Sequence, residues 1–414
     1  MPEIREGWPW KRPYSLTEVC ESYLSDIPLF LPLKDNPIKS LRGTRLVLRH
    51  LTRKTVVRKP QRKSLAALAG VLVLLICATP ILAQDPGEDQ RSERAVPILT
   101  GNAGAFSFVT SGQNLIDTQI NPVLLVPLGD HWLIESRAEF EGQFQRPPGG
   151  GPYGCPVNKH VDYAEVDYIA NPYVTVTAGR FLTPFGIFNE RLYPVWIRGL
   201  QPDPLILPIN TAPSDGAMLR GGFPVDAKVN ANYSLYVSAT SIGIDSVDSE
   251  RHVGGRLGFF FPGPRLEVGG SWQRTLQDER KNAFGFHLGW QPAKIPLNLR
   301  SEFARSFEGS GYWIEGLYRL SQVHFWQKPM RHTEVVARLQ QFYTGEIGPD
   351  GATALGLPGA NARQADFGIN YFFRDGLKGI ASYGRGFSGD GNFNQWSFGF
   401  AYRFAIPLGR VGTP

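Results

Sequence analysis

Hydrophobic and polar residues alternate one by one along most of the chain after about residue 100. In segment 132–144, one parity carries apolar residues such as Trp132 and Phe140, and the other carries charged residues such as Glu135 and Arg137. Because successive side chains of a β-strand point to opposite faces, this period of two predicts strands. The same period recurs in segments 230–240, 265–275, 282–291, 364–373 and 395–406.

Two architectures produce such strands. A soluble sandwich buries the apolar faces between two sheets, whereas a membrane barrel turns them toward lipid and encloses the polar faces. The runs reach the roughly 10 residues that a tilted membrane-spanning strand needs. Charges continue along the polar parity of successive strands, and aromatic residues such as Trp132 and Trp396 lie near strand ends. We therefore predict an all-β, transmembrane antiparallel β-barrel; a soluble secreted β protein is the alternative.

Turn residues between the alternating runs indicate how many strands there are. Bacterial barrels favour even numbers, so we predict about 16 strands, within a range of about 14–18, with one early strand hidden near residues 104–111. The barrel is expected to occupy residues 101–414. The visible strands begin near Thr118, Trp132, His160, Pro172, Gly216, Asn230, Arg251, Arg265, Asn282, Ile295, Gly311, His332, Ala362, Leu377 and Gln395.

The N-terminal region contains an export signal. Residues 53–83 combine a basic cluster, an apolar run and a short stretch that ends at Ala83, an arrangement typical of a cleavable signal peptide. An uncleaved N-terminal anchor is the alternative. We expect residues 1–52 to be a disordered extension upstream of a mis-assigned start, and residues 84–100 to be a polar linker.

Net charge separates the same two regions. The whole chain carries +6, but residues 1–83 hold 14 Lys and Arg against 6 Asp and Glu, a net +8. The other 331 residues hold 29 basic and 31 acidic side chains, a net −2. A nucleic-acid-binding protein would carry its positive charge on the folded domain, so we expect no nucleic-acid partner. After cleavage only Cys155 would remain, which leaves no intramolecular disulfide and no cysteine zinc site.

Residues 182–215 interrupt the alternation. This stretch contains six prolines and many apolar residues, which suits a loop folded into the barrel better than one exposed to water. Charges at a narrow point of a pore set its selectivity. The loop can supply Glu190, Arg191 and Arg198 to such a constriction, with Trp196 beside them. A purely structural plug is the alternative.

Enzyme and cofactor motifs are not found in the sequence. The histidines are scattered singly, and no nucleophile or phosphate-binding motif is present. Residues 390–394 resemble the start of a calcium loop but lack its Gly at Gln395 and its Glu at Ala401. We therefore expect no catalytic residue, no metal site and no cofactor.

The passage 173–199 carries a family resemblance. Gly179-Arg180-Phe181 at the end of a strand, followed by Pro184-Phe185-Gly186, resembles the phosphate-selective porin O/P family of Gram-negative bacteria. The resemblance implies a 16-stranded outer-membrane porin, often a homotrimer, with an inward-folded loop. Residues 84–414 hold 6 Lys and 23 Arg against 31 acidic residues, a balance that does not by itself fix phosphate as the solute.

Together these patterns predict a porin through which small hydrophilic or ionic solutes, phosphate among them, diffuse passively across the bacterial outer membrane. The partners would be outer-membrane lipid and the solutes. A structural or adhesive barrel with a plugged lumen is the alternative function. The candidate lumen cations are Arg137, Arg180, Arg256, Arg300 and Arg338, and the candidate anions are Glu135, Glu139, Glu302 and Asp366.

Overall fold

A computed structural model describes residues 96–409, except 111–112, 146–152, 155, 241–248, 278–279, 375 and 390. The expected N-terminal extension, the signal peptide, most of the linker and Cys155 lie outside the described residues. Within them, no helix is long and apolar enough to cross a membrane.

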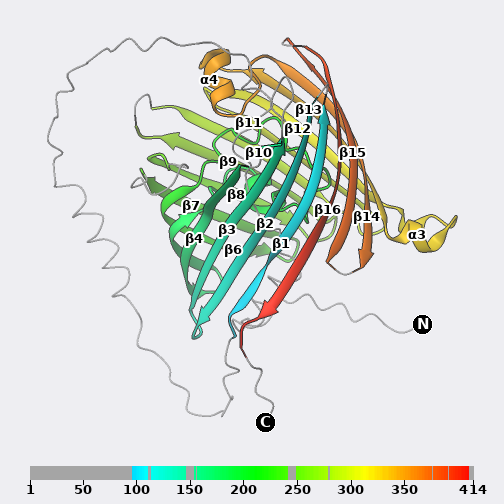
Figure 1. Cartoon of the computed structure of the whole chain (residues 1–414). Helices are drawn as coiled ribbons and strands as arrows, with labels where there is room; N and C mark the ends of the chain where they lie inside the picture. The colour runs from blue at the N-terminus through cyan, green and yellow to red at the C-terminus, as the bar shows by residue number, and fades with distance from the viewer. Residues whose placement is uncertain are drawn as a thin grey trace, which may run out of the picture. The chain divides into compact units, whose positions relative to one another are not determined.

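The sixteen strands form one closed antiparallel barrel, in which each strand pairs with its neighbours in sequence and β16 returns to β1 (Figure 1). This confirms the predicted fold class and strand number. Short helices occur in three connections: η3 (Phe188–Leu192), η4 (Leu320–Gln322) with α3 (Gln327–Arg331), and α4 (Gly348–Ala354). The strands are β1 (Ile98–Thr110), β2 (Gln113–Leu128), β3 (Trp132–Gln145), β4 (Val157–Asn171), β5 (Val174–Phe181), β6 (Ser214–Asp226), β7 (Val229–Ala239), β8 (His252–Phe261), β9 (Leu266–Thr275), β10 (Asn282–Trp290), β11 (Leu297–Arg305), β12 (Gly309–Arg319), β13 (Thr333–Thr344), β14 (Ala362–Arg374), β15 (Leu377–Ser388) and β16 (Phe393–Pro407).

The strand hidden in the sequence is β1, which closes the barrel. It pairs with β16 from Ile98 opposite Pro407 to Thr110 opposite Gln395. Its small residues, including Gly101 and Gly104, weaken the hydrophobic alternation that identified the other strands. Because β1 begins at Ile98, the barrel starts slightly before the expected boundary at residue 101.

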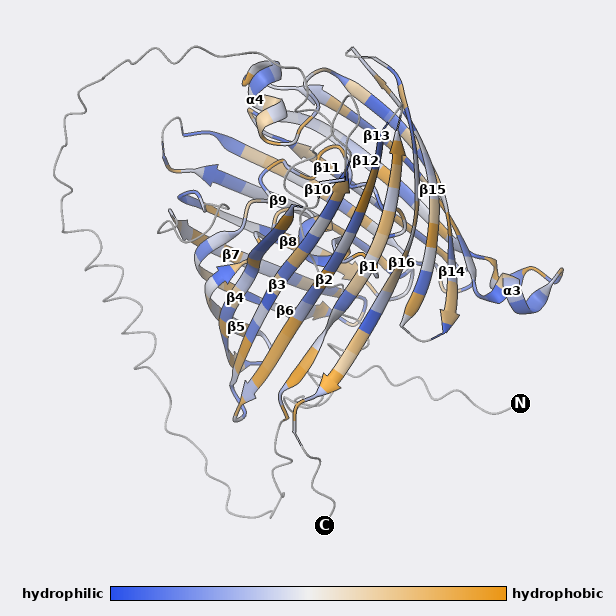
Figure 2. Ribbon diagram, in the orientation of Figure 1, coloured by the Kyte–Doolittle hydropathy of each residue, from blue (hydrophilic) through white to orange (hydrophobic). Residues whose placement is uncertain are grey.

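The two parities of each strand separate into an apolar outside and a polar inside, as the alternating colours along the strands in Figure 2 show. Outward side chains such as Phe286 and Phe398 are 61% and 49% exposed, which suits contact with lipid acyl chains. Inward side chains of β3, such as Glu139, are buried. The soluble sandwich is excluded, because a barrel without edge strands has no second sheet to cover this outer face.

One irregularity in the barrel wall is a β-bulge in β4. Arg137 of β3 pairs with Tyr163 and Ala138 pairs with Val161, so Asp162 has no partner in the β3 register. Asp162 and Tyr163 are both buried, which reverses the inward parity of β4 at this point. The inward residues of β4 are therefore even-numbered before the bulge and odd-numbered after it.

Candidate functional site

The connection between β5 and β6, residues 182–213, folds into the barrel. Its Phe185, Phe188 and Tyr193 are between 1% and 4% exposed. Phe188 meets the ring of Trp313 on β12 edge-on, with centroids 5.9 Å apart. The same cluster includes Phe342 of β13 and residues of the β13–β14 connection. Burial of these aromatic rings stabilises the docked loop through the hydrophobic effect.

The glycine of the Pro-Phe-Gly motif makes this docking possible. Gly186 has a φ of +71°, and a Cβ built there would lie 2.0 Å from the carboxylate Oε1 of Glu302 on β11. The Oε2 atom of Glu302 accepts hydrogen bonds from the backbone amides of Ile187, at 2.9 Å, and Phe188, at 3.0 Å. The motif therefore serves a close approach between the loop backbone and one buried carboxylate of the wall.

Ion pairs hold the first half of the loop to β8 and β9. Glu190 pairs with Arg256 of β8, whose Nη1 also donates to the Gly186 carbonyl at 3.0 Å. The Nη1 atom of Arg191 lies 2.7 Å and 2.8 Å from the two carboxylate oxygens of Glu267 on β9. Two of the charges expected at a constriction are thus paired with the barrel wall.

Hydrogen bonds to loop carbonyls fix the second half against β13, β14 and β15. The Nη2 atom of Arg338 donates to the Pro202 carbonyl at 2.5 Å. Asn370 donates to the Gly199 carbonyl at 3.0 Å, and the Lys378 ammonium donates to the carbonyls of Trp196 and Arg198. These bonds satisfy carbonyl groups of an irregular, buried backbone.

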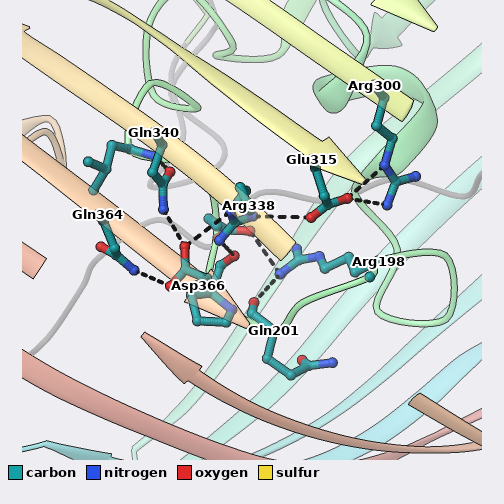
Figure 3. Close-up of polar contacts among 12 residues, drawn as sticks. Arg198, Gln201, Arg300, Glu315, Arg338, Gln340, Gln364 and Asp366 are labelled. Carbon is teal, nitrogen blue, oxygen red and sulfur yellow. Dashed lines mark hydrogen bonds and ion pairs between the residues drawn. The ribbon is translucent and has the colours of Figure 1, made fainter. Parts of the chain in front are cut away.

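Four wall residues form a chain of charges behind the loop, drawn in Figure 3. Arg300 of β11 lies 2.6 Å from Glu315 of β12, and Arg338 of β13 lies 3.8 Å from Glu315 and 3.3 Å from Asp366 of β14. Gln340 and Gln364 also donate to Asp366. Three of these charges, Arg300, Arg338 and Asp366, were predicted for the interior, and the structure brings them together. Glu315 was missed.

Arg198 does not face open space. Its Nε donates to the Tyr193 carbonyl at 2.5 Å, its Nη1 lies 2.8 Å from Asp203, and its guanidinium lies 4.4 Å from the Tyr193 ring centroid. Arg198 therefore links two parts of the loop. Burial raises the pKa of Asp203, the carboxyl group with which Arg198 pairs. Trp196 packs beside Val195 against a second cluster formed by Phe106, Ile380 and Ala401.

The opposite interior wall, formed by β2, β3 and β4, has a different character. Its buried basic groups are Arg137 and the half-buried His160, among the residues described. Glu135, Arg137 and Glu139 face inward as predicted from the alternation. We call this surface the acidic wall; its buried carboxylates are Asp117, Glu135, Glu139, Glu141, Asp162, Glu165 and Asp167.

The expected lumen position of Arg180 is corrected by the structure. Phe181 is the residue that points inward, where it packs with Met218 and Tyr236. Arg180 pairs with Ala164, an exposed residue of β4, and its Nε lies 2.8 Å from Asp215 of β6. It therefore belongs to the outward parity. Val176 and Ala178, which share that parity, already favoured this side.

Several interior residues were not singled out from the sequence. Glu315 could have been found by continuing the alternation along β12, where Trp313 and Leu317 share its inward parity. For Glu267 and Lys378, the position in the strand alternation was the only signal that they face the interior. Asp162 could not be placed by parity, because the bulge that contains it depends on pairing with β3.

Comparisons with known proteins support the fold alone. No protein-family model matches the sequence, and no curated protein matches it. Among solved structures, Salmonella typhi OmpF, in a complex with daunomycin, is similar with a TM-score of 0.52 at 12% identity over 74% of this chain and 97% of that chain. Pseudomonas putida OprB at low pH gives a TM-score of 0.51 at 6% identity over 75% and 93%. The chain therefore has the porin fold.

Proposed function

We propose that this protein is a bacterial outer-membrane channel through which small hydrophilic or ionic solutes diffuse passively. The observation that carries the proposal is the loop 182–213, which is held inside a closed barrel against β8–β15. An inward loop in a barrel with a polar interior can narrow a water-filled path. The apolar outer face supports placement in a membrane. Such a channel needs no catalytic residue.

We extend the proposal to inorganic ions, with phosphate among them. The motif in residues 179–186 supports this through its resemblance to phosphate-selective porins. The ion pairs of the interior favour weak selectivity, because Arg256, Arg300 and Arg338 each lie beside a carboxylate that offsets their charge. We therefore expect phosphate to be one permeant ion rather than the sole one.

The plugged barrel is the second candidate function, and the burial of the interior favours it. Arg137 is 0% exposed, and Arg338 is 1% exposed. Charges that line a wide aqueous channel would keep more contact with water. A structural or adhesive barrel could use the loop as a permanent plug.

Planar-bilayer recording of the purified full-length protein separates the two candidates. The channel predicts discrete conductance steps in KCl, and smaller steps when phosphate replaces chloride. Folded protein that inserts without any steps would refute the channel and support the plugged barrel. We also propose a homotrimer, on the resemblance alone; crosslinking of the detergent-solubilised protein should yield a three-chain species.

A further inference from the structure

A histidine and two carboxylates converge on the acidic wall between β3 and β4. The Nε2 atom of His160 lies 3.1 Å from Oε2 of Glu139 and 3.1 Å from Oδ1 of Asp162. All three atoms lie within 4.8 Å of one another. The side chains of Glu139 and Asp162 are 2% and 1% exposed, whereas His160 is 17% exposed and leaves a path to solvent.

Strand pairing creates this convergence. Glu139 pairs directly with His160 in the β3–β4 register, so their side chains lie on the same face. Asp162 is the bulged residue without a partner on β3, and it adds its side chain to that face. Bulges commonly redirect a side chain toward a functional site.

A proton on His160 does not account for the arrangement. One N–H bond points in one direction, so it cannot make a straight hydrogen bond to two carboxylate oxygens at once. Within the described part of the chain, Oε2 of Glu139 and both carboxylate oxygens of Asp162 lie at ion-pair distance from His160 or Arg137 but accept no well-aligned hydrogen bond. Buried carboxylate oxygens without a partner are costly, and a cation could bind all three groups together.

The distances suit a tetrahedral metal ion. Zinc–nitrogen and zinc–oxygen bonds of about 2.0–2.2 Å place neighbouring ligand atoms about 3.3–3.5 Å apart. The two distances of 3.1 Å are close to that separation. A nitrogen ligand together with only two carboxylates favours zinc or a similar transition metal over magnesium or calcium, which take six or more oxygens.

We propose that Glu139, His160 and Asp162 form a binding site for a divalent transition metal ion of the zinc type, with the fourth position open to the barrel interior. The proposal is independent of whether the barrel conducts. The ion would cross-link β3 to β4 and neutralise part of the acidic wall.

Two neighbouring groups support the site. The Nε atom of Arg137 lies 3.6 Å from Oδ2 of Asp162, the oxygen that faces away from His160, and can orient this carboxylate as an outer-shell partner. Independently, the loop contributes Tyr193, whose buried hydroxyl has no hydrogen-bond partner among the described residues. Burial raises the pKa of this hydroxyl, and the charges of Asp203 and then Glu139 add to the rise.

Calorimetric titration of the refolded, chelator-treated full-length chain with ZnCl2 tests the site. We expect one saturable site per chain for zinc and none of similar affinity for MgCl2. D162N preserves side-chain shape and H160N removes the imidazole ligand while keeping a polar side chain; each should weaken zinc binding about 100-fold or more. The matched control is H287N, which changes another buried interior histidine that has a single carboxylate, Glu267, at 3.6 Å; its zinc affinity should be unchanged.

The folded state of each variant is checked by circular dichroism, and D162N serves if H160N does not fold. X-ray absorption of the zinc-loaded wild type should show one imidazole nitrogen and carboxylate oxygens around the metal. Absence of a saturable site in the wild type would overturn the proposal. So would an equal loss of affinity in H287N, or a metal shell containing sulfur or several imidazoles.

Discussion

The two interior walls of this barrel use charge in opposite ways. On β8–β15, which we call the covered wall, charged and amide side chains are joined to one another or to the loop backbone, as Glu302 and Lys378 are. On the acidic wall, Asp117, Glu135 and Glu141 each retain a buried carboxylate oxygen without a hydrogen-bond partner in the described residues.

The difference indicates where negative charge without a hydrogen-bond partner remains in the interior, among the residues described. Charged side chains of the covered wall hold the irregular loop 182–213 in place. They also form ion pairs, so their electric fields largely cancel. On the acidic wall Asp167 pairs with Arg220 and Asp162 lies near Arg137, but other carboxylate oxygens have no hydrogen-bond partner in the described residues. Cations and water are the groups that could satisfy those oxygens. If the proposed channel conducts, we expect its ion preference to come from the acidic wall and to favour cations.

Uncovering the covered wall should have the largest effect. In G186A, a Cβ would displace the Glu302 carboxylate, and alanine would be strained at a φ of +71°. The strain costs about 1–2 kcal/mol, and each charged hydrogen bond lost from Ile187 and Phe188 adds about 1.5–3 kcal/mol. We expect the loop to undock, which limited proteolysis would detect as faster cleavage within residues 182–213 and bilayer recording as an approximately twofold or larger rise in conductance.

The matched control is G348A. Gly348 has a φ of +69°, but a Cβ added there would meet no atom within 4 Å, so this variant carries the backbone strain without the clash. It should leave loop cleavage and conductance unchanged. Equal effects of both variants would show that the contact between Gly186 and Glu302 does not hold the loop.

Neutralising the acidic wall should have an intermediate effect. The double variant D117N/E135Q replaces two interior carboxyl groups with uncharged amides and leaves Glu139, His160 and Asp162 intact. We expect the ratio of K⁺ to Cl⁻ permeability to fall about two- to fivefold, because the field of the remaining walls is nearly balanced. The reversal potential in a KCl gradient, measured without divalent ions, reports this ratio.

The control for that measurement is E346Q. Glu346 is exposed outside the strands and pairs with Lys281, so its loss changes net charge without changing the interior. The control should keep the wild-type reversal potential. A double variant with an unchanged reversal potential would place ion selection elsewhere than on the acidic wall.

The smallest expected effect concerns pH. Burial, with a contribution from Glu250, raises the pKa of Glu308 in the β11–β12 connection to about 7. Ser306 donates a hydrogen bond to this carboxyl at 3.2 Å, which moderates the rise. Because the folded protein binds this proton more tightly than the unfolded chain, stability should be highest below about pH 4.5 and should fall as the pH rises through about 7.

Urea unfolding at pH 5 and pH 8 measures that loss. E308Q cannot titrate at this position, so the difference in unfolding free energy between the two pH values should shrink, while E346Q should retain it. A difference of the same size in E308Q would assign the pH dependence to other groups.

The fold was largely predictable because a barrel depends on the parity of its residues. In strands such as β14 and β16, apolar residues occupy every second position, so the alternation identified the outward face directly. Only β1 was hidden, since its glycines and alanines give a weak pattern on both faces. Closure itself followed from the even strand number that barrels favour.

The residues that face the interior were predictable, but the side chains with which they pair were not. Alternation placed Arg300, Arg338 and Asp366 inside, but their ion pairs depend on the stagger of neighbouring strands, which a single sequence does not encode locally. Arg198 was expected at a constriction because it is a charged residue of the loop that folds into the barrel. Its actual partners, Tyr193 and Asp203, lie within the loop itself. The prediction for Arg180 was wrong because it followed the family motif and not the outward parity that Arg180 shares with Val176 and Ala178.

The anchoring of the loop also sets an order for assembly. The bonds from Lys378 reach the loop across 182 and 180 residues of chain, and those to Glu302 across 115 and 114. These contacts need the strands that carry them to be in place, so we expect the loop to dock after most of the barrel has formed. Contacts of such long sequence separation are slow to form. We therefore expect docking of residues 182–213 to be a late step of folding that depends on completion of the C-terminal half.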